Sequence, residues 1–195
     1  MTASDLRAAF FVDAVRGRNG VGTYYEDLVS QLRGSMAESA LFCPSMNETG
    51  PYQGRSFRMP GDKTQRVFLP RVQAIGEAMR ALRPHVVVAP VPGPYGLLGA
   101  WHARRRKVPL CICYQTDYAK LAELYWPRIL GAPATRLANV VHRRFFRAGR
   151  RVAAISEDMM IKARRAGVRR PRLIGTPLGY SFAVFTATYC CNFRA

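Results

Sequence analysis

The chain has 195 residues, of which 49% are hydrophobic and 22% are charged, and this composition excludes a largely disordered chain and predicts a globular domain with a sizeable core. Its 30 Lys and Arg residues against 12 Asp and Glu residues give a net charge of +18, which favours anionic partners such as nucleic acid, acidic phospholipid or phosphorylated small molecules. No apolar stretch reaches the length of a membrane-spanning helix, which is about 20 residues, and no export signal is visible. The five cysteines lack the spacing of a disulfide or zinc framework. We therefore expect a cytoplasmic protein with reduced thiols.

The chain opens with a predicted strand at residues 8–14, and an amphipathic helix is expected from about residue 23 to residue 33. Between them, Gly20 and Gly22 would let the backbone pass close to a ligand, and the amino terminus of the following helix attracts phosphate. The third glycine of a dinucleotide-binding fingerprint would fall on Tyr25. The glycine-rich loop therefore also fits a plain strand-to-helix turn.

The next segments lead from residue 39 to residue 82, and no chemistry is visible in the loop among them. We expect a strand at residues 39–43, a long surface loop at residues 44–61, which are rich in Gly, Pro, Ser and Asn, and a strand at residues 65–69. Residues 71–82 predict a helix, whose inward apolar residues are expected to be Val72, Ile75, Met79 and Leu82.

The central stretch carries the strongest pattern. Residues 86–88 and 108–114 predict two strands of a parallel sheet that are buried on both faces, with a turn at Pro92 and Gly93 and a helix at residues 95–106 between them. Ligands of such sheets bind outside the carboxyl ends of the strands. The polar cluster that follows the second strand is therefore the candidate active-site edge: Gln115, Thr116 and Asp117.

The remaining segments repeat the alternation of helix and strand. An aromatic helix is expected at residues 118–126, and a helix at residues 135–148 has a basic side that could lie on an anionic membrane or simply cover the sheet. Residues 152–155 predict a strand, and Ser156 is a good cap for the helix after it. A strand and a helix alternate about six times, so we expect an α/β protein with a Rossmann-like parallel sheet and helices on both faces.

Three segments stand out in their order and spacing: NGVGTYYEDLVSQL, RPHVVVAPVPGPYGLLGAWHARRRKVPLCICYQTDY and VAAISEDMMIKARRAGV. Together they resemble the amino-terminal domain of family 4 glycosyltransferases, which have the GT-B fold. The similarity covers roughly residues 8–178. It implies a Rossmann-like acceptor-side domain at residues 1–178, one half of a GT-B fold, and a divergent tail at residues 179–195.

The resemblance implies a retaining, hexosyltransferase-like enzyme that moves a sugar from a UDP- or GDP-sugar to a lipid-linked or small polyol acceptor, without a metal or a covalently bound cofactor. It places the protein in the cytoplasm, peripherally at the inner face of the cell membrane. The loop that it matches to the donor phosphates is Gly20, Val21 and Gly22. The residues on the acceptor side are Tyr24, Pro92, Gly93, Thr116 and Tyr118.

The catalytic position implied by the resemblance is Gln115 with Asp117, where relatives commonly have Tyr-His-Thr-Asp. Glutamine can form a hydrogen bond with a sugar hydroxyl, but it cannot take up a proton near neutral pH. The acid-base or charge-stabilising role of that histidine is therefore in question for this chain.

The donor-binding half of a GT-B enzyme, with paired glutamates seven residues apart, would follow residue 179. No such pair is present, because the glutamates stand at positions 26, 38, 48, 77, 123 and 157. We expect a truncated or frame-disrupted product, or a domain that works with a separate donor-binding domain, and little or no activity of this chain alone.

Two other function classes stay open. The charge would fit a basic nucleic-acid-binding α/β domain, but no zinc-finger, helix-turn-helix or RNP signature is present, so nucleic acid is not an expected partner. The glycine loop would fit a fragment of an NAD(P)-binding Rossmann oxidoreductase. The high arginine content also fits a composition bias on a solvated surface, so the charge does not decide between a functional basic face and that bias.

Overall fold

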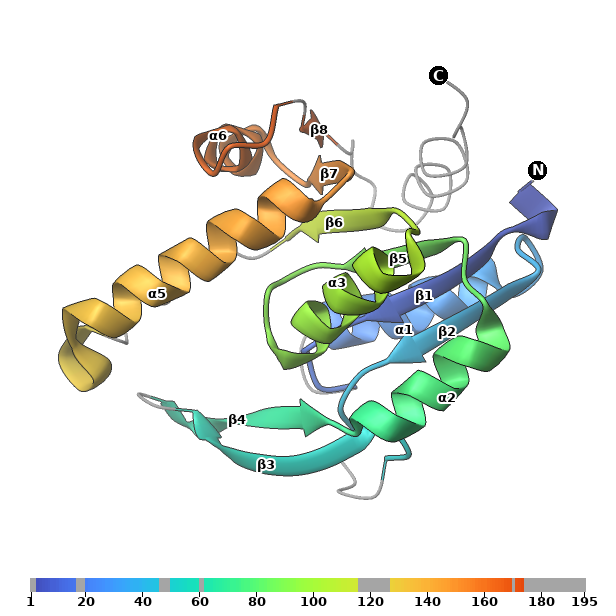
Figure 1. Ribbon diagram of the computed structural model, residues 1–195, viewed down its shortest axis with the longest axis horizontal. Coiled ribbons are helices and arrows are strands. Elements are labelled where there is room, and N and C mark those ends of the chain that lie inside the picture. The colour runs from blue at the N-terminus through green and yellow to red at the C-terminus, as the bar shows by residue number, and fades with distance from the viewer. Residues whose placement is uncertain are drawn as a thin grey trace.

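The chain forms a six-stranded parallel sheet and a separate two-stranded hairpin (Figure 1). The computed structural model describes residues 3–16, 20–45, 50–59, 62–115, 127–169 and 171–173. In spatial order, the strands of the sheet are β2 (Glu38–Phe42), β1 (Arg7–Phe11), β5 (Val86–Ala89), β6 (Leu110–Tyr114), β7 (Arg151–Ala154) and β8 (Arg172–Leu173). The hairpin consists of β3 (Gln53–Met59) and β4 (Asp62–Pro70). The described helices are α1 (Gly20–Leu32), α2 (Val72–Leu82), α3 (Pro94–Arg106), α5 (Pro127–Ala148) and α6 (Glu157–Arg165), and a 3-10 turn spans Ala3–Asp5.

The parallel α/β architecture predicted from the sequence is confirmed. The central strands β5 and β6 are buried along their whole length, as their unbroken apolar sequences predict for strands covered on both faces. Parallel pairing joins β1 to both β2 and β5, with Ala9 opposite Ala40 on one side and Val87 on the other.

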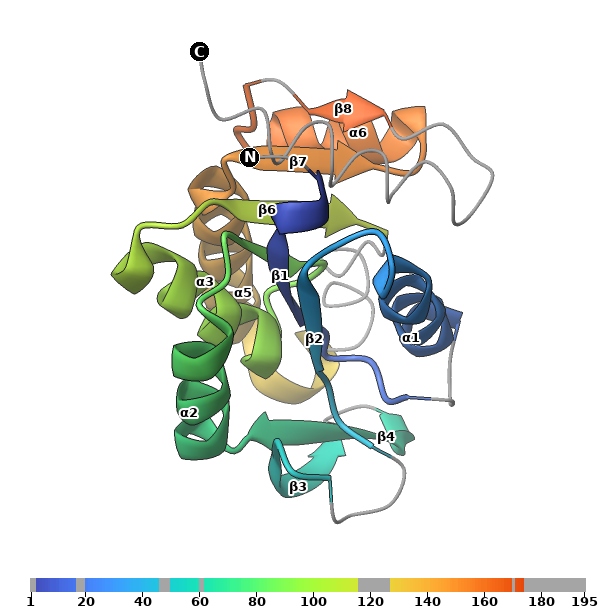
Figure 2. The same ribbon diagram turned by 90° about the vertical axis from the view of Figure 1, so that its right-hand side faces the viewer.

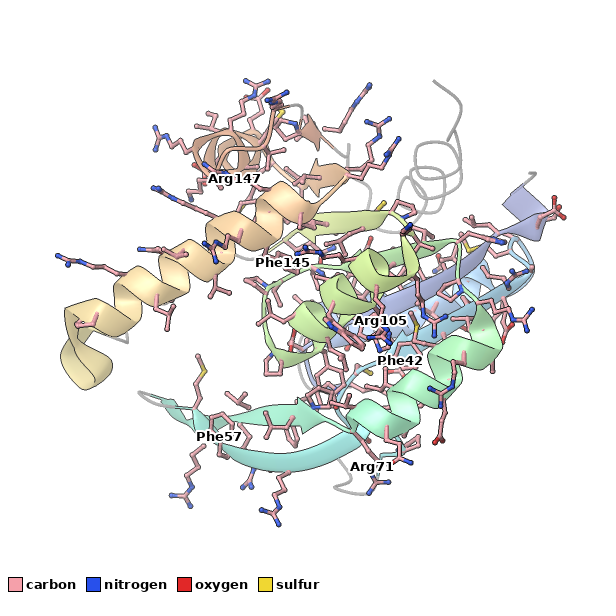
Figure 3. All side chains as sticks on the ribbon, in the orientation of Figure 1. Phe42, Phe57, Arg71, Arg105, Phe145 and Arg147 are labelled. Carbon is pink, nitrogen blue, oxygen red and sulfur yellow. The ribbon has the colours of Figure 1, made fainter. Side chains whose placement is uncertain are left out.

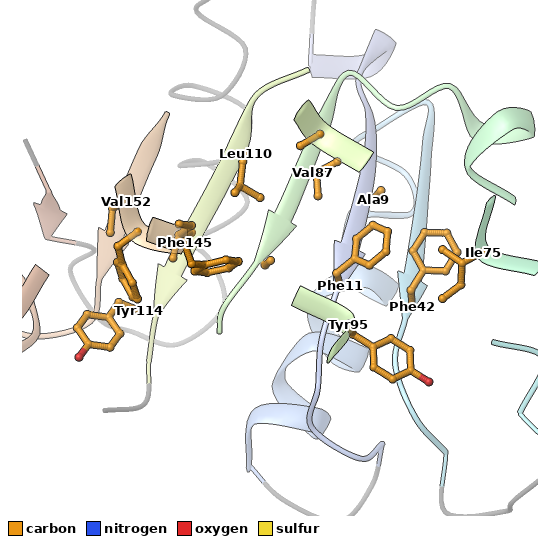
Figure 4. Packing of buried hydrophobic residues seen from close by; sticks show 14 of the residues in the cluster. Ala9, Phe11, Phe42, Ile75, Val87, Tyr95, Leu110, Tyr114, Phe145 and Val152 are labelled. Carbon is orange, nitrogen blue, oxygen red and sulfur yellow. The ribbon is translucent and has the colours of Figure 1, made fainter. Parts of the chain in front are cut away.

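Helices cover both faces of this sheet, and Figure 2 shows α1 on the opposite side from α2 and α3. Side chains of alternate strand residues therefore enter two separate cores. Phe11 and Val87 pack with Ile75 of α2 and Phe145 of α5 (Figure 4). On the other face, Phe10, Val88 and Cys113 pack with three buried side chains of α1: Tyr25, Leu28 and Leu32.

Helix α3 packs on the sheet through small residues. A side-chain carbon added at Gly99 would lie 2.6 Å from Cγ of Phe11, so the helix backbone comes close to β1. Two of its larger apolar side chains face away from the core, since Leu97 and Trp101 are 42% and 48% exposed, whereas Tyr95 is fully buried.

Several predicted boundaries were wrong. The loop expected at residues 44–61 contains β3, which pairs antiparallel with β4. The large apolar residues of β3 are Phe57 and Met59, so its sequence shows no sustained alternation that would have revealed the strand. Val72 is 54% exposed rather than inward, because it is the first residue of α2 and lies beyond the core contact. Helix α5 starts at Pro127 rather than at residue 135.

Other predictions are confirmed or cannot be compared. The Ser156 hydroxyl accepts a hydrogen bond from the backbone N–H of Met159 at 3.3 Å and caps α6 as predicted. The aromatic helix expected at residues 118–126 lies outside the described residues. Among the helices that are described, none is both long and apolar enough to cross a membrane.

Candidate functional site

The carboxyl ends of β1, β5 and β6 lie at one edge of the sheet, and β1 marks the point where the strand order reverses. From β1 the chain crosses to β2 on one side through α1, and it later returns to β5 on the other side after α2. Open α/β sheets bind ligands at such a switch point. The segments that meet there are the residues after β1, the turn between β5 and α3, and Gln115 after β6.

Asp13, two residues beyond β1, connects two of these segments. Its Oδ1 accepts a hydrogen bond from the backbone N–H of Tyr95 at 2.8 Å, and its Oδ2 accepts one from that of Gly96 at 3.0 Å. Both amides belong to the first turn of α3, where the cap residue Gly93 has no side chain to offer. A carboxylate from β1 therefore caps a helix far along the chain, satisfying amides that have no partner within the helix.

The turn between β5 and α3 requires glycine because other atoms fill the space beside it. A side-chain carbon at Gly93 would lie 2.6 Å from Oδ1 of Asp13, and one at Gly96 would overlap the carbonyl oxygen of Val91. The φ of Gly93 is an ordinary −80°, so the requirement is one of space and not of backbone conformation. Asp13 and this turn thus fit together as one rigid unit.

Burial raises the pKa of Asp13 from 3.8 to about 7, although the amides of Tyr95 and Gly96 act in the opposite direction. The side chain is only partly exposed. A carboxyl group with such a pKa exists in both protonation states near neutrality, which is the condition for general acid-base work. Asp13 lies at the switch point, caps α3 and has a raised pKa. It is therefore the strongest candidate for a functional side chain among those that the structure describes at this edge.

A second group of side chains connects β1, α1 and β2 at the same edge. Nε of Arg16 lies 3.5 Å from Oε1 of Glu26 in an exposed ion pair, and the backbone N–H of Arg16 donates to the carbonyl of Pro44 at 3.1 Å. Burial raises the pKa of the Cys43 thiol, while the neighbouring Arg16 lowers it. This group holds the chain after β1 against the chain after β2.

The predicted donor-side loop is not a loop, because Gly20, Val21 and Gly22 form the first turn of α1. Gly22 is buried, whereas a side-chain carbon at Gly20 would meet nothing within 4 Å. The helix begins three residues earlier than predicted, and its Tyr25 packs on β1 with its ring centroid 6.3 Å from that of Phe10. Tyr24 is partly buried and meets Tyr25 edge-on at 5.2 Å.

The structure brings some predicted site residues together and does not describe others. Pro92 and Gly93 lie in the turn capped by Asp13, and Gln115 is partly buried directly after β6. Thr116, Asp117 and Tyr118 lie outside the described residues. The described part of the candidate site therefore consists of the Asp13 unit, the start of α1 and Gln115.

None of the three histidines of the sequence takes the place of the one missing at position 115. His142 is buried against Phe146, with ring centroids 4.5 Å apart. His102 is buried on α3, and burial together with Arg106 and Arg105 lowers its pKa to about 4. His85 lies at the opposite edge of the sheet, where its Nε2 is 3.0 Å from Nη2 of Arg7.

A cavity at the opposite edge of the sheet lies away from the candidate site. A cavity of about 370 Å³ opens at the amino-terminal ends of the strands, and its lining includes Arg7, Arg80 and Arg83. Within the described ranges, no three His, Cys, Asp or Glu side chains gather closely enough to hold a metal ion.

Sequence reasoning missed Asp13 as a site residue. The signal was present, because Asp13 is an acidic residue directly after a buried strand, but the two amides that it caps are more than 80 residues away. A carboxylate after the first strand of a predicted doubly wound sheet would have been a fair candidate on position alone.

The chain is similar to a protein family and, more distantly, to solved structures. No curated protein matches the chain. Among solved structures, that of Glycyrrhiza uralensis UGT73P12 complexed with glycyrrhetinic acid 3-O-monoglucuronide matches with a TM-score of 0.43 at 11% identity. The match covers 87% of this chain and 49% of that chain, so the chain spans about half the length of that structure's chain. The family model for the glycosyl transferase 4-like domain matches residues 19–179, most of the chain and all three segments of the resemblance, and the protein therefore belongs to the glycosyl transferase 4-like domain family.

Proposed function

We propose that this chain is the acceptor-side half of a retaining glycosyltransferase, which transfers a sugar from a UDP- or GDP-sugar to a lipid-linked or small polyol acceptor. The observation that carries the proposal is the family match over residues 19–179. The geometry of the switch-point edge supports it, because Asp13 fixes the turn with Pro92 and Gly93 beside Gln115. A nucleic-acid surface or an NAD(P) site has no comparable support.

In this proposal the edge binds and orients the acceptor. Gln115 forms hydrogen bonds with an acceptor hydroxyl through its amide. Asp13 holds the turn between β5 and α3 in place. Tyr24, whose pKa is raised by burial, keeps its phenolic proton as a further donor. Holding the acceptor in one orientation lowers the entropic barrier to transfer.

The donor half of the site is supplied by a second domain, with the start of α1 facing the donor phosphates. Transfer requires donor and acceptor in register and stabilisation of the charge on the leaving diphosphate. The segment from residue 1 to residue 178 provides one wall of such a cleft, so we propose that it has little activity by itself. The enzyme works in the cytoplasm at the inner face of the membrane, where lipid-linked acceptors are found.

The test is a titration of the isotope-labelled chain, followed by the NMR signals of its backbone amides. A polyprenyl phosphate in detergent and a polyol such as inositol are the acceptor probes, and UDP-glucose and GDP-mannose are the donor probes. We expect an acceptor probe to shift the amides of Gly93, Tyr95 and Gln115, and the donor probes to shift few signals, near Gly20. A Gln115→Ala variant should bind the acceptor probe more weakly, with the remaining spectrum unchanged.

Matched probes separate the other function classes. Detergent alone and a non-polar lipid of equal length must leave the three amides unshifted. Shifts at this edge caused by NADH, or by single-stranded nucleic acid and not by either acceptor probe, would overturn the proposal.

A further inference from the structure

The start of α3 has the arrangement that binds anions in many α/β proteins. It follows the buried parallel strand β5 through a turn with Gly93 as the helix cap, and it lies at the switch-point edge of the sheet. The amides of a first helical turn have no partner within the helix, and they commonly bind a phosphate or carboxylate group. The position of α3 alone would therefore indicate a phosphate site beside the acceptor region.

Every amide of this first turn is already accounted for. Pro94 has no N–H, and the N–H of Leu97 donates to the carbonyl of the helix cap at 2.8 Å. The two remaining N–H groups, those of Tyr95 and Gly96, donate to the two oxygens of Asp13 at 2.8 and 3.0 Å. Each carboxylate oxygen takes one amide, as two oxygens of a phosphate would. The first turn of α3 therefore has no backbone donor left for a ligand.

The turn also lies too close to Asp13 to admit a second anion between them. A side-chain carbon built on Gly93 would lie 2.4 Å from Cγ of Asp13, and one built on Gly96 would lie 3.4 Å from its Oδ2. A phosphate oxygen does not fit between this carboxylate and the backbone of the turn. A second negative charge would have to lie outside the carboxylate, where two like charges repel each other.

The two helix starts at this edge differ in charge. The first turn of α1 contains no acidic residue, and a side-chain carbon built on Gly20 would meet nothing within 4 Å. The exposed Arg16 lies beside α1, 3.5 Å from Glu26. The arginines of α3 are all in its last turn, at the other edge of the sheet, and Arg105 is the one labelled in Figure 3. The α3 side of the site therefore has a carboxylate and no cation from its own helix, whereas the α1 side has open space and a cation.

We propose that Asp13 is a specificity-determining residue, which makes the α3 side of the site select an uncharged hydroxyl group and reject phosphate. The acceptor presents a sugar or polyol hydroxyl to Pro92, Gly93 and Gln115, and any phosphate that it carries points away from α3. The side chain of Gln115 suits this partner because it is neutral and both donates and accepts hydrogen bonds. The identity of the acceptor rests on the proposed function, whereas the exclusion of phosphate by Asp13 is independent of it.

The first experiment is a titration of the isotope-labelled full chain with inorganic phosphate, followed by the NMR signals of the Tyr95 and Gly96 amides. Sodium chloride at equal ionic strength is the reference, and the pH is kept above the Asp13 pKa of about 7. We expect phosphate to leave both signals of the native chain unshifted. In Asp13→Ala the two amides lose their acceptor, so phosphate should shift both signals and bind there about tenfold more tightly.

The matched control is Asp27→Ala, which removes an exposed carboxylate from α1 and changes the net charge by the same amount. Phosphate should leave the Tyr95 and Gly96 signals of this variant unshifted, because Asp13 still accepts from both amides. Equal shifts in the two variants would mean that a general gain of positive charge, and not the freed helix start, binds the phosphate.

The second experiment compares inositol with inositol 1-phosphate as probes of the acceptor region. Asp13→Asn keeps the size of the side chain and one acceptor oxygen but removes the charge, so it tests the proposal even if Asp13→Ala does not fold. The ratio of the two affinities, measured from the signals of Gly93 and Gln115, should favour inositol about fivefold less in Asp13→Asn than in the native chain. A structural role of Asp13 alone would weaken both probes equally.

Three results would overturn the proposal: phosphate shifts of Tyr95 and Gly96 in the native chain, no such shifts in a folded Asp13→Ala, or an unchanged ratio in Asp13→Asn. Inositol shifts at Gln115 together with any of these would overturn the role of Asp13 alone. If phosphate binds Asp13→Ala as expected but neither inositol probe nor any other acceptor probe shifts Gln115, the proposed function fails and the exclusion of phosphate stands.

Discussion

Helices α1 and α3 both begin at the carboxyl edge of the sheet, but they pack on it in opposite ways. Helix α1 fills its face of the sheet with large side chains, including Tyr25 and Leu28, and leaves Gly20 in open space. Helix α3 places Gly96 and Gly99 against its neighbours and turns Leu97 and Trp101 outward. Large buried side chains therefore mark the packed face of α1, whereas on α3 Leu97 and Trp101 are exposed and the glycines, together with the buried Tyr95, mark the contact.

The largest loss of stability is expected from Gly96→Ala, which disrupts the close packing of α3. The added carbon would overlap the carbonyl oxygen of Val91, and a backbone atom cannot move aside as a flexible side chain can. We expect the free energy of unfolding to fall by about 3 kcal/mol, measured by urea denaturation.

The control for this change is Gly20→Ala on α1. It is the same substitution in the first turn of a helix, but nothing lies within 4 Å of the added carbon. It should be neutral or stabilise by up to about 1 kcal/mol. Similar losses from both variants would show that α3 is not held more closely than α1.

The next effect concerns the carboxylate that caps α3 and is absent from α1. Asp13→Ala removes the acceptor for the amides of Tyr95 and Gly96, and we expect a loss of about 1–2 kcal/mol. Hydrogen exchange of those two amides should accelerate more than that of the amides near Leu28. Uniform acceleration over both helices would contradict a local capping role.

Asp13 also gives the fold a dependence on pH. An acid whose pKa is higher in the folded chain than in the unfolded chain stabilises the fold at low pH, and this stabilisation is lost as the pH rises toward the folded-state value. For Asp13 these values are 3.8 and about 7. Relative to Asp13→Asn, which cannot titrate, the native chain should lose free energy of unfolding across that interval. A constant difference between the two proteins would show that Asp13 has an ordinary pKa.

The sequence predicted the parts of this comparison that depend on local patterns. The strands at residues 86–89 and 110–114 and the Ser156 cap were predictable, because each follows from neighbouring residues. The outward position of Trp101 was not, since it follows from the contact between Gly99 and Phe11. The cap supplied by Asp13 was not predictable either, because it joins segments that are far apart along the chain and that only the fold brings together.

A smaller effect is expected where α3 meets the hairpin. The hydroxyl of Tyr95 donates a hydrogen bond to the backbone carbonyl of Tyr52 at 3.1 Å. Tyr95→Phe should cost about 1 kcal/mol and speed exchange at the base of the hairpin. Tyr52→Phe is the control, because it keeps both that carbonyl and the ring that packs on Phe42.

The smallest effect on stability is expected beside α1, where two variants should change the pKa of the Cys43 thiol in opposite directions. The ion pair between Arg16 and Glu26 is exposed, so either Arg16→Gln or Glu26→Gln should change the free energy of unfolding by less than about 1 kcal/mol. The pKa of the Cys43 thiol should respond in opposite directions, because Arg16 lowers it and Glu26 raises it. Only the thiolate reacts readily with a maleimide, so Arg16→Gln should slow labelling of Cys43 and Glu26→Gln should accelerate it. The rates are measured in a Cys190→Ser/Cys191→Ser background, since Cys111 and Cys113 are buried. Changes of the same sign in both variants would mean that altered access, and not charge, controls this thiol, and that the start of α1 is less firmly held than the start of α3.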